Sequence, residues 1–485
     1  MERRKIYRRT TRYILFGVAV LVGLVWARLT PELSGWLPLM IGIAALASFR
    51  KARLVSVYIV TIFGFTLGWY RGGQYMHEVR FLQEISREKV VLNGEALTDS
   101  IYDERGGIAF DLGSLELEAP ETRNIVGKIG ISGHGERMVY RGDKLRIVGK
   151  FYPSRGSYVA RISYAELEVL GRSSSVAYRA TREFTAGMQT ALPEPQASFG
   201  LGLLIGQRNT LPKSTNEVLA MVGLTHIIAV SGYNLTILVQ ATRRLLAKRS
   251  KFQAMLGASL LICSFLIVTG ASPSIVRASI ISFLALGAWY YGRNVRPMVL
   301  ITLTAAATAL WNPLYLWSDI GWYLSFLAFF GVLVVAPLAR RRFLAGRKQH
   351  IFGDIILETV AAQVMTLPLI LYIFHESSFV ALLANILVVP LIPIAMLLSF
   401  VAGVAGMLVP ALSGWLAWPA KWLLTYLLDI ANLVARIPHM QYSVKINFVI
   451  MALFYLIAAT LTYIWWRKTF SNDKITDEKQ VVILS

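Results

Sequence analysis

Cysteine is almost absent from this chain of 485 residues, which contains only Cys263. An intramolecular disulfide is therefore excluded. The sequence also lacks the HxHxDH and HExxH spacings of hydrolytic zinc sites, a GxxxxGK(S/T) loop for ATP, and a GxSxG nucleophile elbow. These absences predict a protein with no bound metal or cofactor and no nuclease or P-loop activity, so we expect it not to be an enzyme.

Apolar residues, by contrast, are abundant. They make up 55% of the chain, and the mean hydropathy is +0.54, which is too apolar for a soluble enzyme of this length. Many separate runs reach the roughly 18–25 residues that a helix needs to cross a bilayer. The composition predicts a polytopic α-helical membrane protein with about eleven to thirteen membrane segments.

The formal net charge of +21 is explained by membrane insertion rather than by nucleic-acid binding. The basic residues gather in alternate loops between the apolar runs, which is the positive-inside pattern. This pattern predicts a multi-pass protein of the cytoplasmic (inner) membrane with both termini in the cytoplasm. The basic N-terminus precedes a long apolar stretch without a small-residue cleavage site, so we expect a retained first helix.

A small β domain is expected between two sets of membrane helices. Residues 1–70 contain three apolar segments and predict three transmembrane helices. Residues 71–172 alternate in polarity between turn residues, which predicts about five or six strands in an OB-like barrel. The charge pattern places this domain outside the cytoplasm. Its basic and acidic residues are equal in number, so a cap or spacer is as reasonable an interpretation as a DNA-binding module.

The remainder of the chain divides into three parts. Residues 173–215 predict a linker with an amphipathic helix and a short re-entrant or interfacial piece. Residues 216–468 predict the main transmembrane bundle, in which the long run 379–409 forms a kinked helix or two short ones at its prolines. Residues 469–485 predict a short cytoplasmic tail.

The most informative segment is "GLTHIIAVSGYNLTILV", from Gly223 to Val239. It holds His226, Ser231, Gly232 and Asn234 within an apolar run. Polar groups in hydrocarbon face a bundle interior or an aqueous path, and Gly232 marks a position where a helix can break. Two interpretations stay open: bonds to neighbouring helices, or the working part of the protein.

Four further polar residues lie in or near apolar helices. Arg277 is either an anchor that reaches the outer surface or a cation facing a path for an anionic substrate. Asp319 either caps a helix or pairs with Arg277. Gln363 and Asn385 are amides that commonly form bonds between helices.

Several segments in order resemble the ComEC competence family, a proposed inner-membrane channel for single-stranded DNA. The segments are "GLLIGQRNTLP", "VGLTHIIAVSGYNLTIL", "GASPSIVRASIISFLALGAWYYGRNV", "WNPLYLWSDIGWYLSFLAFFG", and "QVMTLPLILYIF" followed by "LANILVVPL". The leading helices and the predicted barrel resemble the first half of that family. Members usually have Leu-His after the Ser-Gly, whereas Tyr233 and Asn234 stand here; an asparagine can donate and accept hydrogen bonds but carries no proton charge.

The resemblance implies DNA transport into the cytoplasm during natural transformation. Its path would be lined by the polar residues named above: His226, Ser231, Gly232, Asn234, Arg277, Asp319, Gln363 and Asn385. It also implies an extracytoplasmic DNA receptor and a cytoplasmic helicase or translocase as motor, and it is compatible with a homo-oligomer. Many members carry a metallo-β-lactamase-like nuclease domain that does not occur in this sequence, so a separate nuclease is expected.

Two alternatives from other functional classes stay open. One is an intramembrane hydrolase or acyltransferase that uses His226 and Ser231. These residues are five positions apart and do not share a helical face, so their pairing requires unwound backbone. The other alternative is a small-solute transporter, which paired broken helices in internal repeats would favour.

Overall fold

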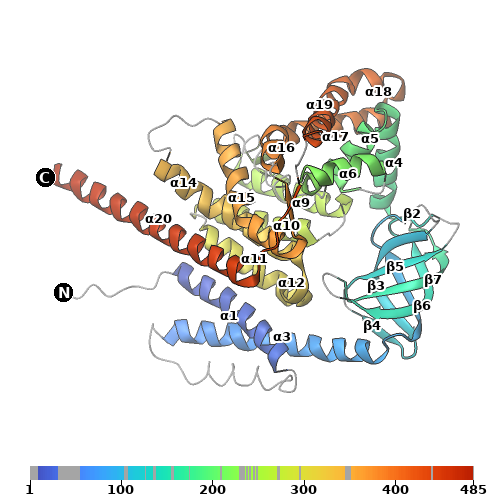
Figure 1. Cartoon of the computed structure of the whole chain (residues 1–485), viewed down its shortest axis with the longest axis horizontal. Helices are drawn as coiled ribbons and strands as arrows, with labels where there is room; N and C mark the ends of the chain where they lie inside the picture. Colours follow the sequence, from blue (N-terminus) through green and yellow to red (C-terminus); the bar gives the residue numbers. More distant parts are fainter. Residues whose placement is uncertain are drawn as a thin grey trace. The chain divides into compact units, whose positions relative to one another are not determined.

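The computed structural model consists of two compact units (Figure 1). One unit contains Met1–Thr185 and Leu235–Tyr323, and the other contains Ala186–Asn234 and Leu324–Ser485. The structure describes residues 9–30, 55–102, 107–125, 127–134, 138–154, 158–173, 175–207, 210–228, 235, 239, 242–243, 246, 250–269, 273–293, 296–343, 351–378, 380–437 and 441–483. We refer to the two as the first and second unit.

The first unit combines membrane helices with a β domain. Its helices are α1 (Arg9–Leu29), α3 (Val55–Glu84), α9 (Lys251–Thr269), α10 (Pro273–Tyr290), α11 (Pro297–Trp311) and α12 (Leu314–Ser318). Helices α1 and α3 lie along each other, and at Gly23 and Gly68 the facing backbones leave no room for a side chain. Small residues allow such close approach where lipid supplies no hydrophobic force between helices.

Helix α3 leads directly into the β domain (Figure 1). It continues to Glu84, past the apolar run that ends near residue 70. The helix therefore extends beyond the predicted start of the β domain at residue 71. Its last turn packs on the barrel, because Leu82 on the helix and Ile85 directly after it belong to the barrel's hydrophobic core. The apolar run could not show this extension, since residues 71–84 are mostly polar and their helix is stabilised by packing.

Five strands of the β domain close into a barrel. The strands of the domain are β1 (Lys89–Ala96), β2 (Ile101–Tyr102), β3 (Gly107–Ala119), β4 (Arg123–Ile125), β5 (Ile129–His134), β6 (Lys144–Pro153) and β7 (Ala160–Gly171). Strand β1 pairs with β3 and β6, β3 with β5, β5 with β7, and β7 with β6. Only the β5–β7 pair is parallel among these strands. This closed Greek-key arrangement is OB-like.

The β domain has two short strands in addition to the five that close the barrel. Strands β2 and β4 are short and pair with β3 alone, so the sheet has seven strands, more than the five or six that the sequence predicts. Alternating residues fill the interior; in β6, for example, Leu145, Ile147 and Phe151 are fully buried. This inward–outward alternation confirms the small β domain expected from the period-two pattern.

The second unit is helical apart from a short strand pair. Its helices are α5 (Gln196–Ile205), α6 (Lys213–Met221), α7 (Thr225–Ile228), α14 (Ala336–Phe343), α15 (Ile351–Phe374), α16 (Val380–Val388), α17 (Ile392–Leu408), α18 (Pro410–Leu416), α19 (Trp418–Ala435) and α20 (Phe448–Ile483). Helix α4 (Val176–Ala191) continues from the first unit into the second, as does α13 (Ile320–Phe330), which a π-turn, η2 (Gly331–Val335), joins to α14. Strands β8 (Glu376–Ser378) and β9 (Gln441–Ser443) pair with each other.

Two long apolar runs of this unit are interrupted. The run 379–409 forms α16 and α17, joined by the 3₁₀ turn η3 (Val389–Leu391) at Pro390, which confirms the predicted interruption at a proline. The run 217–241 is not one continuous helix. Helix α6 ends at Met221, and Gly223 adopts φ +72° before α7 begins. The observed break precedes Gly232, the predicted one, which lies outside the described residues.

Six helices within the described ranges are long and apolar enough to cross a membrane: Thr10–Leu29, Pro273–Tyr290, Ile320–Phe343, Gly353–Phe374, Val380–Leu408 and Phe448–Lys468. Three more apolar helices are shorter. The chain is therefore a multi-pass membrane protein with an inserted β domain. The predicted total of about eleven to thirteen segments also counted short and interrupted runs. It further included the second of the three N-terminal segments, which lies outside the described residues, and the run 217–241, which lies partly outside them.

Candidate functional site

Arg277 lies within α10, near the start of a membrane-crossing helix. Only 3% of its surface is exposed, so it is not the surface anchor that the sequence left open. Its Nη2 donates to the backbone carbonyl of Gly321 at 3.2 Å. Its Nε and Nη1 are buried with no hydrogen-bond partner among the described residues. Buried charged donors are costly unless they are paired, so binding of a partner by these two atoms would be strongly favoured.

Asp319 forms the N-terminal cap of α13. Its Oδ1 accepts from the backbone N–H of Gly321 at 2.8 Å and from that of Trp322 at 3.3 Å. These bonds satisfy two donors that a helix start otherwise leaves unpaired. Asp319 is itself buried, with 8% of its surface exposed, and its charge interacts with that of Arg277. Among the described ion pairs none joins the two residues directly, so their attraction acts across a gap.

Helix α12 connects this pair of charges to the barrel. Leu314 packs against the barrel's hydrophobic core, and Tyr315 follows it. Burial raises the pKa of Tyr315, and the charge of Asp319 acts in the same direction, whereas Arg277 and Lys128 lower the pKa. The phenol therefore lies within electrostatic reach of the barrel lysine and of both helix charges. The "NP" turn at 312–313 places this helix, since Asn312 Oδ1 accepts from the Leu314 N–H at 3.1 Å.

A cation–aromatic cluster on the barrel was missed by sequence reasoning. Lys128 Nζ forms an ion pair with Asp111 at 3.0 Å and lies 4.2 Å from the centre of the Tyr158 ring. The guanidinium of Arg161 is 5.7 Å from the same ring. Burial lowers the pKa of Lys128, but Asp111 and Tyr158 raise it, and the net direction is upward. The lysine is thus held in its charged form.

Two local signals could have indicated part of this cluster. The segment "YVARISY" places an arginine between two tyrosines, a pattern that suits stacking on nucleobases. Tyr164 in the same segment is 78% exposed and has φ +55°. Lys128, however, directly precedes β5 and joins Tyr158, which precedes β7, because β5 and β7 pair in parallel. No local pattern shows this pairing.

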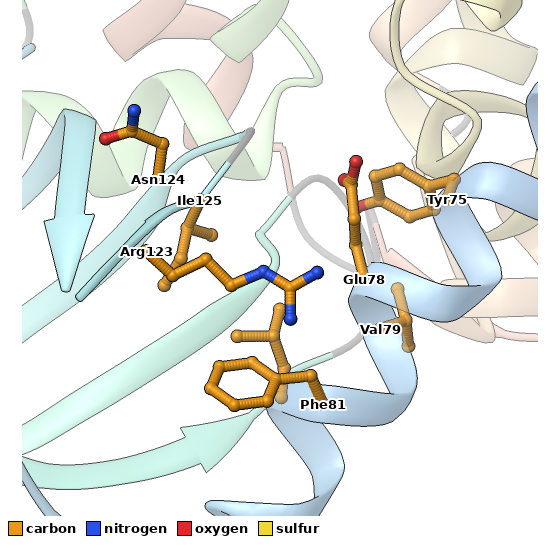
Figure 2. Close-up of a pocket in the computed structure, with 8 residues that line it drawn as sticks. Tyr75, Glu78, Val79, Phe81, Arg123, Asn124 and Ile125 are labelled. Carbon is orange, nitrogen blue, oxygen red and sulfur yellow. The ribbon is translucent and has the colours of Figure 1, made fainter. Parts of the chain in front are cut away.

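A small pocket lies where the end of α3 faces β4 (Figure 2). Arg123 reaches from β4 across the ring of Phe81, with its guanidinium 4.8 Å from the ring centre, and Glu78 and Tyr75 line the pocket from α3. Its accessible space is about 10 Å³, which suits roughly one water molecule. The pocket is therefore part of the junction that holds α3 to the barrel and is too small for a nucleotide.

In the second unit, His226 lies on the short helix α7. Its Nδ1 is 3.0 Å from the carbonyl oxygen of Gly223 in the turn that precedes the helix. A side chain at Gly223 would collide with the Cβ of Ala381 on α16, so this turn packs against α16. Ser231, Gly232 and Asn234 lie outside the described residues. No observation here therefore favours the alternative of a His226–Ser231 enzyme.

Gln363 and Asn385 meet in the second unit. The amide nitrogen of Asn385 on α16 donates to Gln363 Oε1 on α15 at 3.3 Å. Asn385 is buried, and its Oδ1 has no hydrogen-bond partner among the described residues. Asn385 lies one turn after Ala381, the residue that contacts Gly223. The turn that precedes His226 therefore packs on the same face of α16 that carries Asn385.

The predicted site residues that the structure describes thus form two groups, each in its own unit. Arg277 and Asp319 lie together in the first, and Gln363 and Asn385 lie together in the second with His226 on a neighbouring turn. Each group contains one buried side chain with atoms that lack a hydrogen-bond partner among the described residues: Arg277 in the first and Asn385 in the second. Buried polar atoms of this kind are the positions where water, an ion or a ligand can supply the missing bond.

Comparison with known proteins identifies the region that carries both groups. Residues 203–469 match the family described as Competence protein. The chain is 26% identical over 217 residues to ComE operon protein 3 of Bacillus subtilis (strain 168), a match that covers 44% of this chain and 27% of that relative. No solved structure matches the chain. Since the family match covers more than half of the chain and includes every predicted site residue, the protein belongs to the ComEC family of competence proteins.

Proposed function

We propose that this protein conducts a single DNA strand across the cytoplasmic membrane during natural transformation. Membership of the competence family supports a role in DNA uptake. The observation that carries the channel proposal is Arg277, a buried arginine in a membrane helix, two of whose donors have no partner among the described residues. A phosphodiester presents oxygens that match guanidinium donors, and in a low-dielectric path this interaction is much stronger than in water.

The other polar residues would line or shape the same path. The Oδ1 of Asn385, which has no partner in the described part of the chain, and the amide of Gln363 offer neutral hydrogen bonds. Such bonds can replace the hydration of bases and phosphates without trapping the strand. We place His226, Ser231, Gly232 and Asn234 in this path as well, on the strength of the sequence. Conduction needs sites that bind firmly enough to admit the strand and weakly enough to release it.

The proposed topology assigns the partners. The barrel lies outside the cytoplasm and both termini lie inside, so a DNA receptor would act on the barrel side and a motor on the cytoplasmic side. The sequence contains no P-loop, which makes a cytoplasmic helicase or translocase the source of traction. A separate nuclease would degrade the second strand.

The decisive experiment follows labelled double-stranded DNA into competent cells that lack this gene. Cells complemented with the wild-type gene should recover cytoplasmic label and transformants. Cells complemented with Arg277→Ala or His226→Ala should accumulate label outside the cytoplasmic membrane. Immunoblots of the membrane fraction must show equal protein levels, because a buried arginine could also matter for insertion.

Two results would contradict this function. Normal entry of label into the cytoplasm of the deletion strain would remove DNA transport altogether. Equal loss of protein and uptake in Arg277→Ala cells, with normal uptake per molecule of residual protein, would make Arg277 a structural residue rather than part of the path.

A further inference from the structure

We propose that Asp319 is the resident counter-ion of Arg277, and that a phosphodiester of the entering strand replaces it. In this arrangement the pair keeps the path closed to small anions until a polyanion arrives. The inference rests on the proposed DNA path through Arg277 and adds a means by which a membrane channel avoids leaking chloride while no DNA is present.

The backbone of one residue, Gly321, holds both charges in place. The Gly321 N–H donates to Asp319 Oδ1 at 2.8 Å, and the Gly321 carbonyl accepts from Arg277 Nη2 at 3.2 Å. A Cβ at Gly321 would lie 3.2 Å from the same carboxylate oxygen, so the turn fits closely around the carboxylate. The two side chains are therefore fixed by the start of α13 rather than by each other.

In this geometry the charge of the arginine is offset, but only part of its hydrogen-bonding capacity is used. Asp319 Oδ1 is committed to two backbone donors of α13, whereas Arg277 Nε and Nη1 have no partner within the described part of the chain. A direct bidentate ion pair would saturate the guanidinium. A counter-ion held at a distance instead offsets the positive charge without using its donors. An incoming oxyanion can take those donors without first breaking a hydrogen-bonded pair.

The same arrangement discriminates between a single ion and a polymer. A lone chloride must lose its hydration and approach Asp319, with only one charge interaction in return. A phosphodiester in a strand has neighbouring phosphates bound elsewhere along the protein, which raises its effective concentration at Arg277. Repulsion by Asp319 therefore excludes small anions more strongly than it excludes DNA.

Anion flux through the purified full-length protein tests this inference. The protein is reconstituted in liposomes that contain a halide-quenched dye, and iodide entry is recorded. Asp319→Asn removes the charge but keeps the helix cap, because asparagine caps as well as aspartate. We expect this variant to raise iodide flux by about tenfold or more, since an uncompensated positive charge concentrates anions in a narrow path. A single-stranded oligonucleotide should block the added flux.

Two matched variants serve as controls. Arg277→Gln in the Asp319→Asn background should return iodide flux to the wild-type level, because the cation that attracts iodide is gone. Asp143→Asn replaces another buried carboxylate that accepts a backbone N–H, that of Tyr140 at 3.0 Å on the barrel, and should leave the flux unchanged.

Unchanged iodide flux in Asp319→Asn, with the protein folded and inserted, would overturn the inference and leave Asp319 as a helix cap. An increase that persists after Arg277→Gln would overturn it too, since the leak would then not depend on the arginine. Neither result affects the DNA-uptake experiment in cells. DNA uptake that does not depend on this gene would instead refute the proposed function, and it would leave the iodide flux results valid.

Discussion

The two polar pairs differ in what they leave unsatisfied. In the first unit Arg277 is a full charge, held near Asp319 without a direct bond, and two of its donors have no partner among the described residues. In the second unit Gln363 and Asn385 are neutral amides that bond to each other across two helices, and what lacks a partner within the described ranges is the neutral Asn385 Oδ1. Neutral amide pairs contribute modestly to helix association, whereas an incompletely paired buried charge is costly. The first pair therefore requires a functional explanation, and the second is accounted for largely by packing.

Replacement of Arg277 should have the largest effect on DNA uptake. It is the strongest test of the difference between the two polar pairs. Arg277→Gln should reduce cytoplasmic DNA uptake on the order of 100-fold, equivalent to about 2.7 kcal/mol, because it removes the charge that faces the strand. Arg277→Lys should recover part of the uptake, since lysine keeps the charge but not the planar donors. Transformant counts normalised to protein level measure both. A similar 100-fold loss in Gln363→Ala cells would break the comparison.

Disruption of a glycine contact in the second unit should give the next largest effect. We expect it to lower the amount of folded protein rather than the uptake per molecule. Gly406 on α17 lies against the backbone of Gly187 on α4 so closely that a side chain cannot fit. Gly406→Leu should separate the two helices and lower the amount of folded protein several-fold, by the equivalent of about 1–3 kcal/mol of overpacking. Gly414→Leu is the matched control, because no atom lies within 4 Å of a Cβ at that position. Equal yields in detergent would contradict this prediction.

Loss of the Asp319 cap is expected to have a moderate effect. Asp319→Ala removes both backbone hydrogen bonds at the start of α13 and should destabilise the protein by about 1 kcal/mol. Asp319→Asn should be nearly as stable as the wild type, since its side-chain oxygen can still accept these bonds. Thermal unfolding of the purified variants in one detergent measures the difference. Equal destabilisation by both substitutions would show that the charge, and not the cap, holds this turn.

The amide pair should give the smallest effect. Asn385→Ala removes the 3.3 Å bond to Gln363 and should cost about 0.6 kcal/mol, the average for such bonds in membrane proteins. Thermal unfolding should shift slightly, and DNA uptake should fall less than in Arg277→Gln cells. If Asn385→Ala reduced uptake as much as Arg277→Gln while the protein stayed stable, Asn385 would be as important for DNA uptake as Arg277.

Tertiary contacts decided which predicted site residues meet. The sequence suggested that Asp319 either caps a helix or pairs with Arg277; the structure has it as a cap whose charge also interacts with Arg277. The bond between Gln363 and Asn385 joins helices separated by a turn, so no periodicity within one helix could reveal it. The barrel lysine Lys128 joins Tyr158 through a parallel strand pair, and pairing between distant strands leaves no local trace.

The sequence by itself determined the membrane class and the presence of an inserted β domain. These features follow from long apolar runs and from period-two alternation. Both patterns are local, because each records which side chains are removed from water, in the bilayer or on the buried face of a strand. Only the tertiary structure decided that α3 continues to Glu84, that the helix before His226 breaks at Gly223, and that Arg277 is buried with donors to spare. Those outcomes depend on which surfaces pack together, and packing can override the local preference of a segment.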